Sequence, residues 1–458
     1  ATKFYNVTSM RPVTAIDISY TSLLRVALPL SLGAFVQFLV VLTDNLFLSR
    51  VSENALNGAG NGGMLYVTAV MLGVGLSAGV QIVVARRSGE QQVESIGSWL
   101  GSGLRLALFL SVLLFLVYLG MDVLLFDHIL NSAEILKVMR EFLSIRMFGL
   151  FVYLPTLMFT GFYTGIARTG VLTISMGLTA GLNILFDYLL VFGIGPFPAM
   201  EHEGAALATL IAETSGLLFI LIYTFRRYGK TEFMLYRTVF VRKAGQARRL
   251  LSLSYPIMVQ QVLALATWTT FYFLVEKVGG MELKVSHIVR NTYLLAFVTV
   301  MGVGYTTRTI VSTLIAENRQ GELGKAIQRL IVLNMGGALL LCHGLIAYPE
   351  AIASLFFSED DPGFLPLIRS FRVVFFAIVV FSVSSILLNT IEGSGRTRQA
   401  MRIELAVIAI YLGLVYVITI VNPQPIHVIW MSDYLYFGLL AAGCAAYLKF
   451  SSWKYTSV

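Results

Sequence analysis

The sequence predicts an all-α integral membrane protein with about twelve transmembrane helices. Of its 458 residues, 57% are hydrophobic and only 13% are charged, whereas a soluble domain carries about 25% charged residues. The mean hydropathy is +0.78. Most of the chain consists of apolar stretches near the roughly 20 residues that cross about 30 Å of hydrocarbon. These observations favour a membrane protein over the nucleic-acid-binding protein that a net charge of +8 could otherwise suggest.

The apolar stretches divide the chain into twelve predicted spans. No polar stretch between them exceeds a long loop, so we expect no aqueous domain. The spans lie near residues 23–49, 58–85, 97–126, 141–166, 171–195, 204–225, 252–275, 286–315, 328–356, 371–392, 399–421 and 427–448.

The loop charges alternate in sign along the chain, which predicts its orientation. Under the positive-inside rule the basic loops face the cytoplasm. We therefore expect both termini, residues 1–22 and 450–458, on the cytoplasmic side of a bacterial or archaeal inner membrane. The basic loops contain Arg86 and Arg87, Arg168, residues 226–249, 319–329 and 396–402, and the acidic loops contain Glu201, Glu203, Glu359, Asp360 and Asp361.

A basic linker at residues 226–249 separates an N-lobe, 23–225, from a C-lobe, 250–449. Sliding one half over the other by 226–229 positions aligns Pro29 with Pro256, and MLGVGLSAG with VMGVGYTTR. Each half has six spans that start on the same side. This pattern predicts parallel repeats related by an axis along the membrane normal, with the substrate between two six-helix lobes.

Three polar residues lie deep inside apolar spans. Asp44 lies in the first span, and Asn183 and Asp187 lie in the fifth. A carboxylate at bilayer depth costs a few kcal/mol or more, so it normally faces a protein interior and is functional. Asn183 and Asp187 are four residues apart and therefore share one helix face. Two acids and a carboxamide predict a cation or proton site, which indicates transport across the membrane.

Several strings, in order, resemble one known family. ALPLSLGAFVQFLVVLTDNLFLSRV resembles the first helix of multidrug and toxic compound extrusion (MATE) transporters, and NALNGAGNGGMLYVTAVMLGVGLSAGVQIVVARRSGE resembles the second. TGIARTG and IEGSGRT are similar to the family's inner turns, NILFDYLLVFGIG to helix five and GAALAT to the start of helix six. The resemblance covers nearly the whole chain. It implies a V-shaped central cavity, alternating access, and export of bulky, often cationic organic compounds in exchange for Na⁺ or H⁺, without another cofactor.

The resemblance also implies which residues bind the coupling ion. In the branch resembling DinF and archaeal homologues, the site falls on Asp44, Asn183, Asp187, Thr209 and the backbone carbonyl of Ala205. Hard oxygen ligands of this kind suit Na⁺, and two neighbouring carboxyl groups can share a proton. The alternative is a polar cluster that only ties three helices together.

The second lobe departs from another branch of the family, which resembles NorM. That branch has a Glu in helix seven, where this chain has Ala264 or Leu265, and an Asp in helix ten, which here is free of acids over FFAIVVFSVSSILLNT. The chain is therefore closer to the DinF-like branch, and its coupling site is predicted in one lobe. The repeat partners of the N-lobe triad are apolar: Phe271, Ala409 and Gly413.

Candidates for the substrate cavity are aromatic or basic. Phe38, Trp268, Phe271 and Tyr272 are the aromatic candidates, and Arg290 is a candidate for binding an anionic group on a substrate. Arg290 has two alternatives: an ion pair with Glu276, or snorkelling to the interface. His287 also lies within helix eight, and four other embedded charges are expected to form ion pairs or line the cytoplasmic half: Arg308, Glu213, Glu392 and Asp433. Two arginines at matching repeat positions are expected to be structural anchors: Arg146 and Arg372.

A secondary antiporter is the leading functional hypothesis. Its partners would be a small organic substrate, membrane lipid and the coupling cation, with no nucleic acid, and we expect a monomer. The alternative is a lipid or lipid-linked precursor flippase of the same superfamily, which Arg290 and Arg308 favour because such substrates carry phosphates. An enzyme or channel is disfavoured, because the chain has no HExxH, Walker A or GxSxG motif and no repeated pore loop.

Overall fold

The computed structural model describes residues 16–126 and 132–455. Within these ranges the regular elements are helices, and twelve are long and apolar enough to cross a membrane. The prediction of an all-α membrane protein is confirmed. The first six spans are α1 (Tyr20–Val51), α2 (Glu53–Gly89), α3 (Val93–Leu124), α5 with α6 (Ala133–Arg146 and Leu150–Gly165), α7 (Gly170–Phe192) and α8 (Glu201–Tyr228). The other six are α10 (Gln246–Glu276), α11 (Gly280–Ala316), α12 (Leu323–Cys342), α15 (Phe364–Gly393), α16 (Thr397–Tyr416), and α17 with α18 (Ile426–Trp430 and Ser432–Phe450).

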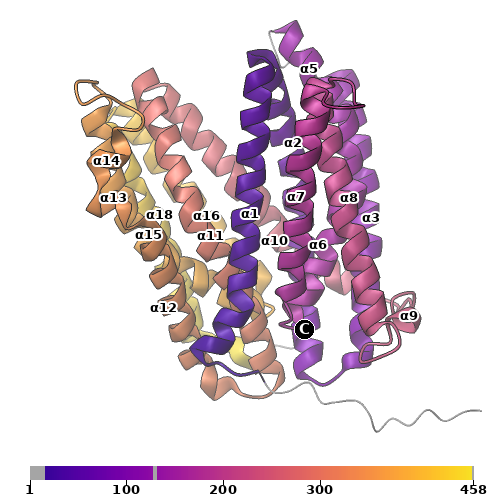
Figure 1. The fold of residues 1–458 in the computed structure, drawn as a ribbon. Helices are drawn as coiled ribbons and strands as arrows, with labels where there is room; N and C mark the ends of the chain where they lie inside the picture. The colour runs from indigo at the N-terminus through magenta and orange to yellow at the C-terminus, as the bar shows by residue number, and fades with distance from the viewer. Residues whose placement is uncertain (1–15, 127–131, 456–458) are drawn as a thin grey trace, which may run out of the picture.

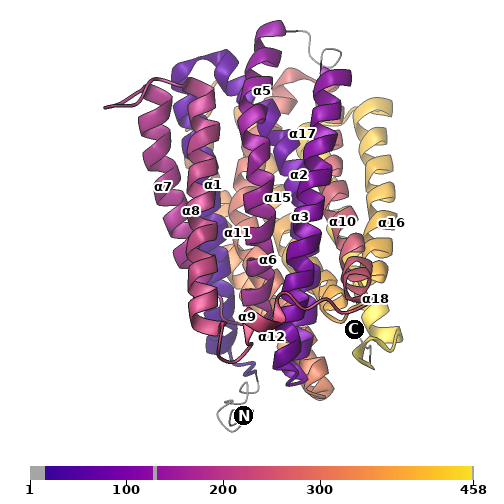
Figure 2. The same ribbon diagram turned by 90° about the vertical axis from the view of Figure 1, so that its right-hand side faces the viewer.

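The twelve spans form two lobes, α1–α8 and α10–α18 (Figure 1). The lobes come together toward the end that carries the short helix α9 (Leu235–Thr238), and they diverge toward the end that carries α5 and α14 (Pro349–Ala353). Helix α1 begins and helix α18 ends on the side of α9 (Figure 2). We call this the linker side and the other the far side.

Helix ends follow the local sequence. The Ser52 hydroxyl accepts the backbone N–H of Ala55 at 3.0 Å and so caps α2. Charged side chains at both ends of α2 interact favourably with the helix dipole. Glu53 lies in the first turn, and Arg86 and Arg87 lie in the last turn. Helix α7 ends at Gly193, whose φ of +68° is a left-handed conformation that glycine adopts without strain.

The segment before α1 forms a small charged cap. Asp17 accepts hydrogen bonds from the Ser19 hydroxyl at 2.5 Å, the Ser19 backbone N–H at 3.0 Å and the Ser22 hydroxyl at 2.9 Å. These hydrogen bonds, led by that of the Ser19 hydroxyl, lower the pKa of Asp17 to about 2. The carboxylate therefore stays ionised at the N-terminus of α1, where a negative charge is favourable.

Turns on the linker side repeat between the lobes. Gln91 after α2 and Asn318 after α11 have φ values of 57° and 58°. Ala167 after α6 and Gly395 after α15 have φ values of 55° and 89°. Left-handed backbone is uncommon outside glycine, so its recurrence at matching positions supports the internal repeat independently of the side chains.

Glycines allow the lobes to touch at two related places. A Cβ on Gly75 of α2 would lie 2.5 Å from the backbone of Met258 on α10. A Cβ on Gly302 of α11 would lie 2.7 Å from the backbone N of Ser31 on α1. Both contacts follow the same repeat offset. Small residues at these positions permit backbone-to-backbone packing, as is common between membrane helices.

Hydrogen bonds join the lobes on the linker side of these contacts. The Gln81 side chain on α2 donates to the Tyr305 carbonyl at 2.6 Å and to the Thr309 hydroxyl at 2.9 Å, both on α11. The Ser312 hydroxyl of α11 donates to the Ile82 carbonyl at 2.9 Å. The lobes are therefore joined by direct hydrogen bonds on the linker side.

Two predicted spans differ most from the observed ones. The fourth, predicted at 141–166, is the broken pair α5 and α6, which begins at Ala133. The ninth, predicted to reach residue 356, ends at Cys342 and is followed by the short helices α13 (Gly344–Ala347) and α14. Pro349 disfavours helical backbone at Tyr348, which has φ −141° and ψ 46°, and starts α14 instead.

Candidate cation site and substrate pathway

Helices α7 and α8 bring three of the predicted site residues into one hydrogen-bonded group. The Asn183 amide donates to Asp187 Oδ2 at 3.0 Å and to Thr209 Oγ1 at 3.3 Å. The Thr209 hydroxyl donates in turn to the Ala205 carbonyl at 2.9 Å. Asp187 is 0% exposed and Asn183 is 1% exposed. The four-residue spacings therefore place these groups on facing sides of two packed helices.

Helix α1 adds Asp44 to this group. Helix α1 packs along α7, and the Asp44 carboxyl lies against that of Asp187, close enough to share a hydrogen bond when one carries a proton. The structure thus brings together all five residues that the sequence assigned to the site. We call Asp44, Asn183, Asp187, Thr209 and the Ala205 carbonyl the N-lobe acid cluster.

Acceptors outnumber donors in the N-lobe acid cluster. Asp44 Oδ1, Asn183 Oδ1 and Asp187 Oδ1 are buried and find no hydrogen-bond donor within the described ranges. Buried polar atoms are otherwise almost always paired. A cluster that only tied helices together would match its acceptors with donors. The oxygen atoms of the cluster fit a Na⁺ ion, which needs several oxygen ligands. They also fit a proton shared between the two carboxyl groups.

A buried ion pair lies beside this cluster. Arg146 of α5 binds Glu213 of α8 through two hydrogen bonds, at 2.8 and 2.6 Å, and its guanidinium lies 3.7 Å from the centre of the Tyr66 ring. Both charges of the pair act on Asp44. Because Glu213 binds both terminal nitrogens of Arg146, the pair adds little net positive charge beside Asp44.

The C-lobe contains buried acids at different places. Glu392 at the end of α15 pairs with Arg308 of α11 at 3.0 Å. Glu404 of α16 accepts hydrogen bonds from Gln260 at 2.6 Å and from the Tyr436 hydroxyl at 3.3 Å. Sequence reasoning missed Glu404, because it follows a basic loop and resembles one more loop charge.

Asp433 at the start of α18 is a third buried acid of the C-lobe. It accepts from the Tyr293 hydroxyl at 2.5 Å and from the Tyr411 hydroxyl at 3.3 Å. We call Glu392, Glu404 and Asp433 the C-lobe acids. Asp433 and Glu404 each accept from two side-chain donors, whereas Glu392 is paired with the charge of Arg308 and its Oε2 atom accepts no hydrogen bond from the described residues.

Comparison with known proteins identifies the family. The family model described as MatE matches residues 29–189 and again residues 256–418, one match in each lobe. The two matches begin at an offset within the range that aligns the halves of the sequence. This chain belongs to the MatE family.

Other MatE proteins match most of the chain. A protein named probable multidrug resistance protein NorM from Synechocystis sp. is 24% identical over 93% of both chains. The protein of the same name from Pseudomonas putida is 27% identical over 76% of this chain and 75% of its own. The family comprises multidrug efflux transporters, so this chain is a membrane transporter and not an enzyme.

Solved MatE structures have the same fold. An outward-facing multidrug resistance MATE transporter superposes with a TM-score of 0.88 over 99% of this chain and 100% of its own, at 19% identity. A transporter from Pyrococcus furiosus, described as having a binding pocket of reverse polarity, superposes with a TM-score of 0.86 over 98% and 100% of the two chains, also at 19% identity. The two-lobe arrangement therefore agrees with experimentally determined relatives.

The predicted substrate residues of this MatE protein have different surroundings. Phe38 on α1 and Trp268 on α10 are half-buried, and Trp268 packs edge-on against Tyr293 at 5.6 Å between ring centres. Phe271 is 1% exposed and packs on Trp430 inside the C-lobe core. Phe271 therefore borders no open space in this structure, because its side chain points into the lobe.

Arg290 lies in an aromatic and basic region of α11. Its guanidinium lies 5.4 Å from the centre of the Tyr272 ring, and it forms no ion pair with the described residues, Glu276 included. His287 stacks on the same ring, with 5.2 Å between the ring centres and an interplanar angle of 9°. The Tyr272 ring thus contacts two basic side chains, Arg290 and His287, on neighbouring turns of α11.

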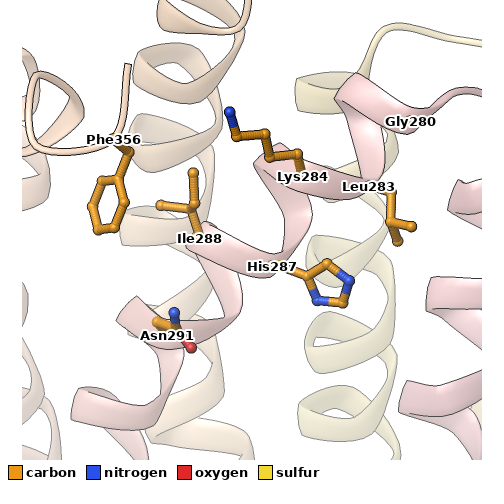
Figure 3. A pocket seen from close by; sticks show the side chains of 7 residues that line it. All are labelled: Gly280, Leu283, Lys284, His287, Ile288, Asn291 and Phe356. Carbon is orange, nitrogen blue, oxygen red and sulfur yellow. The ribbon is translucent and has the colours of Figure 1, made fainter. Parts of the chain in front are cut away.

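A cavity of about 380 Å³ opens next to this region. Figure 3 shows Lys284, His287 and Asn291 on successive turns of α11, with Phe356 facing them from the segment after α14. Among the described residues that line it, two are basic and none is acidic. This cavity is a candidate contact for a negatively charged part of a ligand.

Proposed function

We propose that this protein is a secondary antiporter that exports organic, amphipathic and often cationic compounds in exchange for Na⁺ or H⁺. The observation that supports the proposal is the N-lobe acid cluster, in which three buried acceptors lack donors beside two carboxyl groups. A monovalent cation supplies the positive charge that this group needs. No other cofactor is required for such an exchange.

The cation acts on the balance between access states. Asp44 comes from α1, whereas Asp187 and Thr209 come from α7 and α8, so a bound Na⁺ or proton draws α1 against the other two helices. Substrate in a V-shaped cavity between the lobes favours the other state. Each ligand shifts the equilibrium only by its difference in affinity for the two states. Phe38, Trp268 and Arg290 are the proposed substrate contacts.

We further propose a one-sided coupling site, as in the DinF-like branch. Ala264 and Leu265 occupy the helix-seven positions, and helix ten has no acid over 375–390, although the curated relatives described above carry the name NorM. Phe271, the repeat partner of Asp44, is an apolar core residue.

The proposed orientation has the linker side in the cytoplasm. Residues 1–22, the basic linker 226–249 and the tail 450–458 then face the cytoplasm, and the lobes 23–225 and 250–449 lie in the inner membrane. The charge distribution of the loops supports this orientation. We expect a monomer, because each chain contains both lobes of the transport unit.

The test is dye export from proteoliposomes driven by a Na⁺ gradient alone or a pH gradient alone. We expect one of the two gradients to drive export by the wild-type protein. Asp44→Asn and Asp187→Asn should each abolish that export while the purified proteins remain folded. Export at the wild-type rate by Asp187→Asn would overturn the coupling site.

A flippase for lipids or lipid-linked precursors is the second candidate. Arg290, which has no ion pair with the described residues, lies near His287 and Lys284 and favours this function, because these side chains can bind phosphate. Arg308 no longer supports this reading, since Glu392 neutralises it. Competition of a phospholipid headgroup with a cationic dye would distinguish the functions. Loss of lipid binding in Arg290→Gln without loss of dye binding would favour the flippase.

A further inference from the structure

A second cavity lies on the linker side, where the two lobes meet. Its volume is about 620 Å³. Val83 of α2 and Trp99 of α3 form its N-lobe wall, and the first turns of α10 and the turn between α15 and α16 form its C-lobe wall. Five arginines line it: Arg248, Arg249, Arg396, Arg398 and Arg402. We call this cavity the arginine groove.

The positive charge of the groove is not balanced by acids. None of the described residues that line it is an Asp or a Glu. Arg248, Arg249 and Arg402 are exposed and form no ion pair with the described residues. Arg398 donates to the Ser252 hydroxyl at 3.0 Å and lies 5.5 Å from the centre of the Tyr255 ring, both uncharged partners.

Several arginines elsewhere on the same side are paired with acids. Arg168 binds Glu232 at 2.7 Å, Arg319 binds Glu322 at 2.7 Å, and Arg87 pairs with Glu90. The positive-inside rule accounts for basic residues on one side of the membrane, but it does not account for a single cavity lined by Arg248, Arg249, Arg398 and Arg402, four arginines without an ion pair to the described residues. Like charges held together in this way repel each other unless an anion joins them.

We infer that the arginine groove binds a phosphate-bearing ligand, namely the headgroup of an anionic membrane lipid. Guanidinium groups bind phosphate through paired hydrogen bonds, and basic pockets between transmembrane helices accommodate lipid headgroups. The N-termini of α10 and α16 at the same cavity add to the positive field.

The position of the groove favours a lipid over a soluble anion. The spans α2, α10 and α15 end or begin here, which is headgroup level for the leaflet on this side. Val83, Trp99 and Leu253 give the groove an apolar floor beside its arginines, and tryptophan is enriched at this depth. The glycerophosphate headgroup of the lipid would bind the arginines, and the acyl chains of the lipid would remain among the helices.

The lipid would also affect the transport cycle. The groove has walls from both lobes, so a ligand that fills it is bound most tightly when the lobes are together on the linker side. Such a ligand stabilises that access state over the other by its difference in affinity for the two. This inference does not depend on which ion drives transport or on the N-lobe acid cluster.

The experiment measures lipid binding to the purified full-length protein. Delipidated protein in detergent receives phosphatidylglycerol, phosphatidylcholine or inorganic phosphate, and retained lipid is read by native mass spectrometry together with the shift in thermal unfolding. We expect phosphatidylglycerol to bind and stabilise, and the other two to have little effect. Equal stabilisation by inorganic phosphate would overturn the lipid assignment in favour of a soluble phosphate.

Matched variants test the place of binding. The triple variant R248Q, R398Q and R402Q should lose affinity for phosphatidylglycerol by about 100-fold, since each arginine near an anionic headgroup contributes roughly a factor of five. The control R226Q, R227Q and R237Q removes the same charge from exposed positions on the same side outside the groove, and should keep its affinity. Equal losses in both would overturn the groove in favour of general surface charge.

A charge-conserving variant covers the case in which the triple glutamine protein does not fold. R248K, R398K and R402K keep the net charge but cannot form paired hydrogen bonds with phosphate. We expect an intermediate loss of affinity for phosphatidylglycerol and a normal unfolding temperature without lipid. Unchanged affinity in the lysine variant would show that guanidinium geometry has no role and would overturn the inference of a specific headgroup site.

Discussion

The two lobes both bury carboxylic acids, but they surround them differently. In the N-lobe, Asp44 and Asp187 lie together, and Asp187 accepts from the Asn183 amide while buried oxygens of all three residues lack a donor. In the C-lobe, Asp433 lies between two tyrosine hydroxyls and Glu404 between an amide and a tyrosine. Burial is similar in the two lobes, whereas the supply of hydrogen-bond donors is not.

Under the proposed mechanism, this difference separates acids that bind an exchangeable cation from acids that hold helices together. A buried carboxylate whose acceptors are filled by protein donors has little to gain from an added cation. One whose acceptors are unfilled gains a large part of its lost hydration when a cation enters. Two buried oxygens of the C-lobe also lack a donor within the described residues. Gln260 Oε1 carries no charge, and Glu392 Oε2 lies 3.0 Å from the Arg308 guanidinium, which balances its charge.

Two of the C-lobe acids lie in the opposite half of the membrane from the N-lobe acid cluster, whereas Asp433, in the first turn of α18, lies in the same half. Asp44 and Asp187 are close to the far-side ends of α1 and α7, whereas Glu392 and Glu404 are close to the linker-side ends of α15 and α16. Their repeat partners are not acids: Phe271 stands where the repeat would place Asp44. The lobes therefore share a backbone but have diverged in where they place charge.

The largest expected effect comes from exchanging one aspartate in each lobe for asparagine. Asp187→Asn should reduce gradient-driven dye export to background, because a neutral amide cannot exchange a cation. Asp433→Asn should retain export within about twofold but lose about 1–3 kcal/mol of stability, because Tyr293 and Tyr411 lose a charged acceptor. Export assays and thermal unfolding measure the two effects. Loss of coupling in Asp433→Asn at unchanged stability would erase the distinction between the lobes.

The next largest effect concerns two arginines that the repeat aligns. Arg146→Met should cost about 3–5 kcal/mol, because it leaves Glu213 buried without its partner. Arg372→Met should change stability by less than about 0.5 kcal/mol, because its partner Glu350 is exposed and 3.5 Å away. Unfolding of the two variants in the same detergent measures the difference. Comparable losses would mean that the buried pair is no more important than the exposed one.

A smaller effect is expected where the lobes touch. Gly75→Ala and Gly302→Ala should each cost about 1–3 kcal/mol and slow transport, because the added methyl meets the backbone of the other lobe. Gly60→Ala on the same helix as Gly75 is the control: nothing lies within 4 Å of its added methyl. That change should be neutral or stabilise by up to about 1 kcal/mol. A harmless Gly75→Ala would argue against close contact between the lobes.

The smallest effect compares the two matching turns. Ala167 has φ 55° where the other lobe has Gly395 with φ 89°. Ala167→Gly should stabilise the protein by about 0.5–1 kcal/mol by relieving left-handed strain, and Gly395→Ala should destabilise it by about 1–2 kcal/mol. Thermal unfolding of both variants measures these opposite signs. The same sign in both would show that the turns are not equivalent.

The fold could be predicted largely from composition and periodicity. Twelve apolar stretches, alternating loop charges and a central basic linker were enough to predict the spans, since a bilayer tolerates few alternatives to helices. The boundaries near Met147 and Pro349 were missed, because a broken helix and two short helices that follow a span have the same hydropathy as one continuous helix.

The site could be predicted in part. The depth and spacing of Asn183 and Asp187 indicated one helix face, and Asp44 stood out as a second embedded acid. Its contact with Asp187 depends on how α1 packs on α7, which no local pattern encodes. Gln260 and Glu404 illustrate the limit, because they are 144 residues apart and neither has a signal in its own neighbourhood.

The glycine contacts between the lobes lie away from the middle of their helices, and this position affects how far each side moves when the lobes rotate. Gly75 lies 22 residues from the far-side end of α2 and 14 from its linker-side end, and Gly302 divides α11 in the same proportion. At 1.5 Å per residue, the two lever arms are about 33 and about 21 Å. Rocking about these off-centre fulcrums would move the far side about one and a half times as far as the linker side. A given rotation would therefore open a wider gap between the lobes on the far side than on the linker side.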